Sequence, residues 1–297
     1  MASPAATLRL RLQAPGMLVA PGAYDAIGAR LIEQAGFEAV YMTGAGTSAA
    51  RGFPDFGLLD MGEMVGNAAV MARSVAIPLI ADADTGYGNE LNVTRTVREY
   101  EARGVAGIHI EDQVAPKRCG HLDGKEVVSR AEFMSKIRAA VEARRTPDFV
   151  LIARTDARAM LGVDEALWRA NAALEAGADM VFVEAMQTPE EVAQVPRSVQ
   201  GPCLLNVVPG GRTPVFDLRE AEQMGYKLAI LPGLMLKAAI EAGDAALAEL
   251  KSTHKAPATS ATVAQTFRRF GADEWDALRT RFNAGATMDG NPGARGT

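Results

Sequence analysis

A (β/α)8 TIM barrel, an α/β fold, is the fold class that this 297-residue sequence predicts. Three observations support the prediction: eight short apolar runs recur along the chain, helical patterns separate them, and polar residues follow nearly every run. Each run is continuously apolar, as expected for a strand that is buried on both faces of a parallel sheet. The runs cover residues 17–22, 39–44, 77–84, 107–112, 149–156, 180–185, 203–208 and 227–232.

Helical periodicity occupies the segments between these runs, including residues 91–103, 130–145, 164–175 and 189–195. Residues that favour helix N-caps precede several helices, namely Asp25, Ser129, Asp164 and Thr188. The main rival is a doubly wound open sheet, which requires a G-x-G-x-x-G turn after its first strand. The sequence PGAYDAIGA at 21–29 lacks that pattern, so the barrel is favoured.

The C-terminal part of the chain differs in composition. We assign residues 1–251 to the barrel domain and 252–297 to a C-terminal extension of extra helices with a flexible tail. A helix predicted at 262–284 carries more aromatic residues than a solvent-facing helix needs, so it packs either on the barrel or on another subunit. The last residues, 288–297, are expected to be disordered.

The composition disfavours several classes of partner. The net charge is −5 and no basic cluster is present, which argues against a nucleic-acid partner. No run reaches the roughly 18 apolar residues that a membrane span needs, and the N-terminus lacks the apolar segment of a signal peptide. Cys119 and Cys203 are the only cysteines and have no disulfide-framework spacing. We therefore expect a cytoplasmic protein without membrane contact.

Polar residues at the ends of the predicted strands converge on one mouth of a barrel. Buried carboxylates are costly without a cation, and oxygen ligands suit Mg²⁺. The alternative interpretation is that some of these carboxylates cap helices or form ion pairs with Arg154 and bind no metal. The strand-end residues are Tyr41, Thr43, Asp82, Asp84, Glu111, Asp112, Arg154, Asp156, Glu184 and Asn206.

Three further features suggest chemistry. The guanidinium of Arg154 suits a bidentate grip on a substrate carboxylate, the alternative being an internal salt bridge to Glu184 or Asp156. The small residues of 43–46 allow backbone N–H groups to approach an anion. Cys119 lies in the sequence KRCGH at 117–121, where cationic neighbours are expected to lower its pKa and make it an acid or base. His109 is expected to be a hydrogen-bonded core residue, and Cys203 core filler.

The motifs ADADTGYG (81–88), GIHIEDQ (107–113), KRCGH (117–121) and ARTDA (153–157) resemble the isocitrate lyase / phosphoenolpyruvate mutase superfamily. The similarity spans residues 17 to about 250 in consistent order, and KRCGH resembles the lyase and hydrolase branches. The resemblance implies a Mg²⁺-dependent barrel, with Mn²⁺ as an alternative metal. It also implies a homotetramer of paired subunits that exchange the last barrel helix.

Carried over to this chain, the resemblance implies a role for each matching position. Asp84 is then the most direct metal ligand, with Asp82 and Glu111 acting through water. Cys119 is the general acid–base on a mobile loop, and Arg154 grips the carboxylate. Other positions complete the pocket: Tyr41, Thr43, Gly44 and Ala45 hold a 2-oxo acid portion, His121 and Arg118 steady the loop, and Gly120, Glu184, Asn206 and Pro232 line the remainder.

The activity implied is cleavage of a 2-hydroxy di- or tricarboxylate, of the 2-methylisocitrate or 2,3-dimethylmalate type, to a 2-oxo acid such as pyruvate and a second carboxylate. Position 43 is Thr where many members have Ser. After KRCGH the chain reads LDGK at 122–125, which looks more like dimethylmalate lyases and oxaloacetate hydrolases than like 2-methylisocitrate lyases. An oxaloacetate-type hydrolase or decarboxylase therefore stays an alternative, as does a phosphonomutase-like or non-catalytic dicarboxylate-binding barrel. A hydrolase needs a polar group near the eighth strand, where this chain has Pro232.

Overall fold

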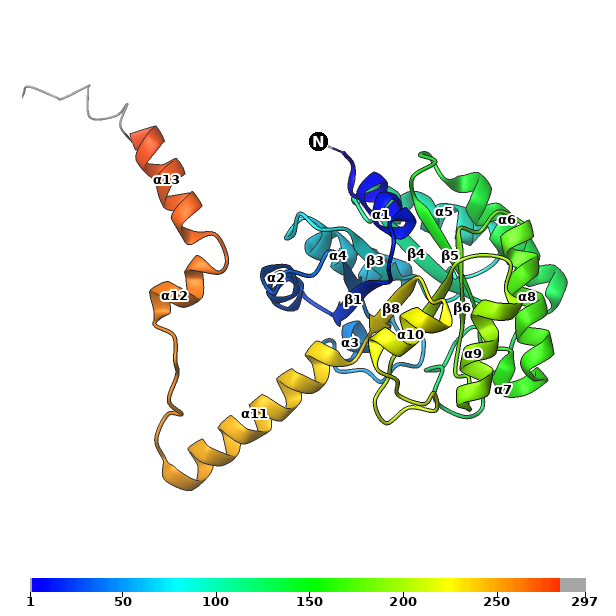
Figure 1. Ribbon diagram of the computed structural model, residues 1–297. Coiled ribbons are helices and arrows are strands. Elements are labelled where there is room, and N and C mark those ends of the chain that lie inside the picture. Colours follow the sequence, from blue (N-terminus) through cyan, green and yellow to red (C-terminus); the bar gives the residue numbers. More distant parts are fainter. Residues whose placement is uncertain (1, 284–297) are drawn as a thin grey trace, which may run out of the picture. The chain divides into compact units, whose positions relative to one another are not determined.

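Eight parallel strands form a closed barrel in the computed structural model, which describes residues 2–283. Each strand pairs with the next one in the chain, and β8 pairs with β1, which closes the sheet (Figure 1). The fold-class prediction is confirmed, because one strand lies in each predicted apolar run. The strands are β1 (Leu18–Ala23), β2 (Val40–Met42), β3 (Leu79–Asp82), β4 (Gly107–Glu111), β5 (Val150–Thr155), β6 (Met180–Val183), β7 (Cys203–Asn206) and β8 (Leu228–Leu231).

Helices surround the barrel and cover the outer face of the sheet (Figure 1). Asp25, Ser129 and Thr188 are N-caps as predicted, but Gly162 occupies the N-cap of α8 and Asp164 lies in its first turn. The helices of this part are α1 (Pro4–Gln13), α2 (Ala26–Gln34), α3 (Gly44–Ala49), α4 (Met61–Ala72), α5 (Glu90–Ala102), α6 (Arg130–Ala143), α7 (Arg158–Leu161), α8 (Val163–Glu175), α9 (Pro189–Ser198) and α10 (Leu218–Met224).

The barrel interior is a packed hydrophobic core. Side chains from most of the strands, including Ile80, Ile152 and Phe182, form one buried cluster together with Leu8 of α1. Two further clusters lie between the strands and the surrounding helices. Because both faces of every strand are covered, the strands read as continuous apolar runs in the sequence. The filled interior leaves the strand ends as the place for polar side chains.

The chain divides into two compact units, 1–241 and 242–297, and the boundary falls within α11 (Leu234–Thr253). The second unit includes α12 (Val263–Arg268) and α13 (Ala272–Asn283), so the single helix predicted at 262–284 is two helices. Gly271, with φ +86°, separates them. The division predicted at residue 251 stays a prediction, and residues 288–297 lie outside the described residues.

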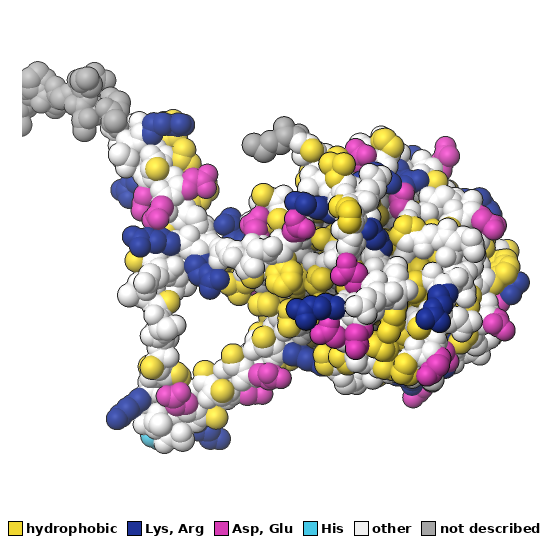
Figure 2. Space-filling view, viewed as in Figure 1, with side chains coloured by type: hydrophobic (Ala, Val, Ile, Leu, Met, Phe, Trp, Pro, Cys, Tyr) yellow, Lys and Arg dark blue, Asp and Glu magenta, His cyan; other side chains and the backbone are white. Residues whose placement is uncertain are grey.

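Large apolar side chains are exposed on the helices of the second unit, and Figure 2 shows apolar patches on their surfaces. Leu247, Phe267, Trp275 and Phe282 are each at least 60% exposed. Such a density of exposed apolar side chains is typical of an interaction surface. Within residues 2–283, no helix is both long enough and apolar enough to cross a bilayer.

Candidate active site

A pocket of about 210 Å³ lies at the carboxyl ends of the strands. Eleven of the fifteen predicted site residues line it, because the ends of parallel strands in a barrel converge on one mouth. Glu111, Asp84, Gly44 and Arg118 do not line it. The eleven are Tyr41, Thr43, Ala45, Asp82, Cys119, Gly120, His121, Arg154, Glu184, Asn206 and Pro232.

Arg154, at the end of β5, is the central cation of the pocket. Its Nε lies 2.9 Å from Asp156 Oδ2 and 3.2 Å from Glu111 Oε2, and one Nη lies 3.2 Å from Glu184 Oε2. Although burial opposes it, these carboxylates raise the pKa of Arg154 well above its usual value. The internal salt bridges considered from the sequence are therefore present. Arg154 still lines the pocket, so a carboxylate grip stays a prediction.

Asp82 is a carboxylate of the rim that is held by two backbone hydrogen bonds. It accepts from the backbone N–H groups of Asp84, at 2.9 Å, and Gly44, at 3.2 Å. Burial raises the pKa of Asp82, but the nearby charges of His109, Lys117 and Arg154 and the Asp84 N–H together lower it to about 2. Asp82 is therefore ionised at neutral pH. The N–H of Gly44 faces this carboxylate and does not line the pocket, contrary to its predicted substrate-binding place.

Asp84 and Glu111 are buried carboxylates that lack good hydrogen-bond donors. Asp84 Oδ1 and both Glu111 oxygens receive no hydrogen bond within residues 2–283, although Lys117 Nζ lies 2.9 Å from Asp84 Oδ1. Burial raises the pKa of Asp84 to about 6 and that of Glu111 well above its usual value. Asp84 also has a φ of +46°, a region that Asp tolerates better than most residues. Both groups thus favour a nearby cation.

These oxygens fit a hard divalent cation, which takes carboxylate ligands and keeps several waters. All of the available ligand atoms are oxygens. Several of them are buried without a hydrogen-bond partner, so a positive charge nearby would stabilise them. Lys117 and Arg154 face the acids in this structure. Among the described residues, no three His, Cys, Asp or Glu side chains are gathered closely enough to form a metal-binding group by themselves. A metal here would therefore complete its shell with water or substrate.

Tyr41 and His109 form a buried hydrogen-bonded pair at the floor of the pocket. The Tyr41 hydroxyl lies 2.7 Å from His109 Nε2, and the rings stack at 5.8 Å between centroids. Burial lowers the pKa of His109 to about 4 and raises that of Tyr41 well above its usual value, so both are uncharged at neutral pH. The prediction that His109 is a hydrogen-bonded core residue is confirmed.

Cys119 lies on the loop that follows β4, half-buried at the pocket wall. Its backbone N–H donates to the carbonyl of Asp55 at 3.1 Å. Burial, followed by the charge of Asp55, raises the pKa of the thiol. The expectation that its cationic neighbours lower this pKa is wrong, because their charged groups are engaged elsewhere. The resting thiol is protonated at neutral pH.

The neighbours of Cys119 show where those charges lie. The ammonium of Lys117 lies between Asp55 and Asp84, at 2.5 and 2.9 Å. The guanidinium of Arg118 lies over the ring of Phe56, 5.4 Å from its centroid, which places it outside the pocket it was expected to line.

His121 also contacts the pocket wall. Its Nδ1 accepts from the backbone N–H of Arg212 at 3.0 Å, and its Nε2 lies 3.5 Å from Glu184 Oε1. Glu184 in turn accepts a hydrogen bond from Asn206 Nδ2 at 3.0 Å. These contacts connect the loop to the ends of β6 and β7. The loop-steadying role of His121 stays a prediction.

Several lining residues were missed in the sequence. Asp55 comes from a loop without strand or helix signal, and only its ion pair with Lys117 reveals it. Leu236 and Lys237 belong to the first turn of α11, which reads in the sequence as an ordinary amphipathic helix. Phe182 and Val208 sit in apolar runs that predict core, and nothing in the sequence marks them as pocket residues. None of residues 122–125 lines the pocket.

The fold and this site together define a (β/α)8 barrel with a pocket of acidic, basic and thiol side chains at the carboxyl ends of its strands. The family model described as phosphoenolpyruvate phosphomutase matches residues 8–251. The chain therefore belongs to the phosphoenolpyruvate mutase/isocitrate lyase superfamily, which confirms the resemblance in its motifs.

Individual relatives show which branches are similar. The 2,3-dimethylmalate lyase of Eubacterium barkeri is 48% identical over 267 residues, covering 90% of this chain and 91% of that protein. The 2-methylisocitrate lyase of Aeropyrum pernix is 42% identical, with 85% and 82% of the two chains covered. Among solved structures, an oxaloacetate acetylhydrolase in complex with 3,3-difluorooxalacetate is 40% identical, with a TM-score of 0.90 over 95% of this chain and 97% of that one.

Proposed function

We propose that this protein is a divalent-metal-dependent carbon–carbon lyase that cleaves a 2-hydroxy dicarboxylate to a 2-oxo acid and a second carboxylate. The observation that carries the proposal is the placement of a protonated thiol, Cys119, in the same small pocket as the cation Arg154 and the ionised Asp82. A binding barrel alone needs no buried acid next to its anion site. The similarity to 2,3-dimethylmalate and 2-methylisocitrate lyases supports the same reaction class.

The favoured substrate is 2,3-dimethylmalate. Phe182, Val208 and Leu236 give part of the pocket wall an apolar surface, which suits methyl groups better than a third carboxylate. The ammonium of Lys237, the other cation of this wall, is bound to the carbonyl of Pro209 at 2.5 Å. A 2-methylisocitrate would need a free cation there. The pocket therefore supports a dicarboxylate with methyl substituents.

In the proposed reaction, Arg154 holds the carboxylate next to the reacting hydroxyl, and Tyr41 and Thr43 line the same end of the pocket. Asp84, together with Asp82 and Glu111, would hold Mg²⁺ or Mn²⁺, which would supply Lewis acidity to lower the pKa of the substrate hydroxyl. As the C–C bond breaks, the hydroxyl carbon becomes the carbonyl of pyruvate and the electron pair passes to the departing carbon.

Cys119 Sγ supplies the proton that this carbon needs, and its raised pKa keeps that proton in place until then. His121 and Gly120 close the pocket beside Glu184, which limits water access to the enolate-like product. The substrate thus loses its hydroxyl proton to solvent and gains a carbon-bound proton from Cys119. Solvent reprotonates the Cys119 thiolate between turnovers, which closes the proton balance.

Hydrolysis of oxaloacetate is the alternative, supported by the similarity to the oxaloacetate acetylhydrolase. The wall after β8 bears on the choice. Pro232 lines the pocket there and offers no side-chain polar group to orient an attacking water. We therefore favour the lyase.

The test is an assay of purified protein with Mg²⁺ against 2,3-dimethylmalate, 2-methylisocitrate, isocitrate and oxaloacetate. Formation of pyruvate from 2,3-dimethylmalate, abolished by EDTA, is the expected result. Release of oxalate and acetate from oxaloacetate alone identifies a hydrolase instead. If the protein turns over none of these four acids, the proposal is overturned, and the phosphonomutase-like and binding-only alternatives have to be considered again.

We further propose a cytoplasmic homotetramer of helix-exchanged dimers. The free cysteines Cys119 and Cys203 support a reducing compartment. The exposed apolar side chains of the second unit support burial against another subunit.

A further inference from the structure

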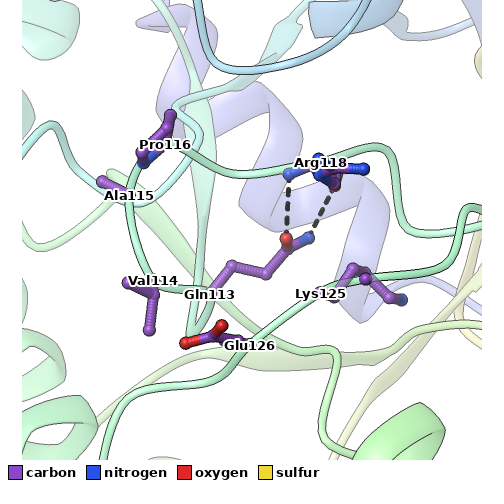
Figure 3. Close-up of a pocket in the computed structure, with 8 residues that line it drawn as sticks. Gln113, Val114, Ala115, Pro116, Arg118, Lys125 and Glu126 are labelled. Atoms are coloured by element: carbon purple, nitrogen blue, oxygen red, sulfur yellow. Dashed lines mark hydrogen bonds between the residues drawn. The ribbon is translucent and has the colours of Figure 1, made fainter.

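Cys119 is held between two peptide groups that are each fixed by a buried side chain from the stem of its own loop. The stem is closed by backbone hydrogen bonds, Val114 N–H to the carbonyl of Glu126 and Val128 N–H to that of Asp112, each at 2.9 Å. A pocket of about 170 Å³ lies between this stem and the loop (Figure 3). The backbone of Cys119 makes two hydrogen bonds of its own, from its N–H to the carbonyl of Asp55 at 3.1 Å and from the Leu122 N–H to its carbonyl at 2.9 Å. The peptide groups on either side of it are held by side chains.

Gln113 fixes the residue before the cysteine. Its side-chain amide donates from Nε2 to the carbonyl of Arg118 at 2.8 Å and accepts at Oε1 from the Arg118 N–H at 3.0 Å, as the dashed lines in Figure 3 show. Gln113 is 1% exposed, so water does not compete for these bonds. Only an amide carries a donor and an acceptor in this geometry, which makes Gln113 specific for the main chain at 118.

Lys125 fixes the residue after the cysteine. Its buried ammonium donates to the carbonyl of Gly120 and to Asp156 Oδ1, the latter at 2.8 Å. Asp156 also accepts a hydrogen bond from Arg154 Nε at 2.9 Å. The main chain at 120 is thereby connected, through one carboxylate, to the cation of the substrate pocket.

The packing of Gly120 explains why this connection controls position. A Cβ atom at residue 120 would lie 2.6 Å from an Nη of Arg154 and 2.6 Å from Cγ of Glu184. The backbone thus lies directly against the pocket wall, and a shift of a few tenths of an ångström at Gly120 changes the distance from Cys119 to the pocket.

We propose that Gln113 and Lys125 are positioning residues that hold Cys119 at the reacting end of the pocket. They act by fixing the peptide groups of Arg118 and Gly120. The expected effect on turnover rests on the proposed function, in which Cys119 donates a proton. The expected effect on the position of the thiol is independent of that function. Neither side chain is needed to close the stem, which has its own backbone hydrogen bonds.

The experiment measures alkylation of Cys119 by iodoacetamide in the full-length protein and in Lys125→Met and Gln113→Glu, with peptide mass spectrometry to separate the two cysteines. Cys203 is an internal reference, because burial raises its pKa to about 12. Lys227→Met is the matched control, since that ammonium also binds two backbone carbonyls, of Ala14 and Gly16, at the other end of the barrel. Cys119→Ser identifies the signal of the thiol itself.

Loss of either support is expected to raise the alkylation rate of Cys119 about tenfold while Cys203 stays unreactive, because each variant removes a buried hydrogen bond that opposes local opening. Turnover of the lyase substrate should fall by about tenfold or more in kcat, with KM changed by less than about threefold. Lys227→Met should match the wild type in both measurements.

Two results overturn the proposal. One is a Cys119 alkylation rate in both variants that equals that of the wild type. The other is parallel exposure of Cys119 and Cys203, which shows general unfolding. If the wild type has no lyase activity, the proposed function fails by itself, and the alkylation rates still decide whether Gln113 and Lys125 position the thiol. Lys125→Arg, which keeps the charge, should restore part of the protection.

Discussion

The ammonium of Lys117 lies 2.9 Å from Asp84 Oδ1, so a cation from the Cys119 loop contacts the acid proposed as the most direct metal ligand. The same ammonium lies 2.5 Å from Asp55 Oδ1. Because a buried ammonium needs a counter-charge, Asp55 can keep Lys117 paired while Asp84 binds a metal. The proposed metal site and the contacts of the loop would therefore be linked through one lysine.

Mg²⁺ should stabilise the protein, and the effect should depend on the ionisation of Asp84. The pKa of this carboxyl is raised from 3.8 to about 6, chiefly by burial, so protons compete with the metal as the pH falls through 6. Saturating Mg²⁺ is expected to raise the Tm by about 5 °C near pH 7.5 and by much less near pH 5. Differential scanning fluorimetry measures both, with Asp84→Asn as the control that should not respond. An equal shift at both pH values would contradict the assignment of Asp84.

Substitution of the proposed acid should affect turnover and leave binding nearly unchanged. Cys119→Ser is expected to lower kcat by about 10²-fold or more, since a hydroxyl is a far weaker acid than a thiol. Because burial raises the thiol pKa, wild-type kcat should stay level through neutral pH and fall only at alkaline pH, where the thiol loses its proton. Steady-state kinetics across the pH range checks both expectations. A serine variant within a few-fold of the wild type would remove Cys119 from the mechanism.

Arg154 should be needed for its shape as well as its charge. In Arg154→Lys the single ammonium cannot reach Asp156, Glu111 and Glu184 together and cannot grip a carboxylate with two parallel bonds. We expect kcat/KM to fall by about 10²-fold or more. Arg158→Lys is the matched control, because Arg158 pairs with Glu191 outside the pocket. Similar losses in the two variants would show that the effect is one of stability.

The exposed aromatic residues of the second unit should be required for assembly. Trp275 is 71% and Phe267 60% exposed, and burial of such side chains typically stabilises a subunit interface. Trp275→Asp and Phe267→Asp are expected to reduce the molar mass in light scattering coupled to size exclusion. Arg279→Asp, on the same helix as Trp275, is the control for added negative charge. A tetramer in all three variants would mean that this surface does not carry the assembly.

The barrel and its strand-end residues follow from the sequence for a physical reason. Buried parallel strands leave continuous apolar runs, and the polar residues at the carboxyl end of each run lie at the common mouth, as Glu111 and Arg154 do. The local sequence pattern is therefore sufficient to predict where a residue lies when a strand positions it.

The loop could not be predicted in the same way. Its side chains are directed by partners far away in the chain: Lys117 by Asp55, Arg118 by Phe56 and Lys125 by Asp156. Adjacent charges in KRCGH suggest a low thiol pKa only if the side chains face the sulfur. Here they do not, and burial decides the direction instead.

The absence of a side chain at Gly120 makes the loop sensitive to a single added carbon. A methyl group there would occupy space within 2.6 Å of both Arg154 and Glu184. It would act as a wedge between loop and pocket wall, with no change of charge, nucleophile or metal ligand. Gly120→Ala is thus expected to push the loop away from the pocket wall while every chemical group of the pocket is kept.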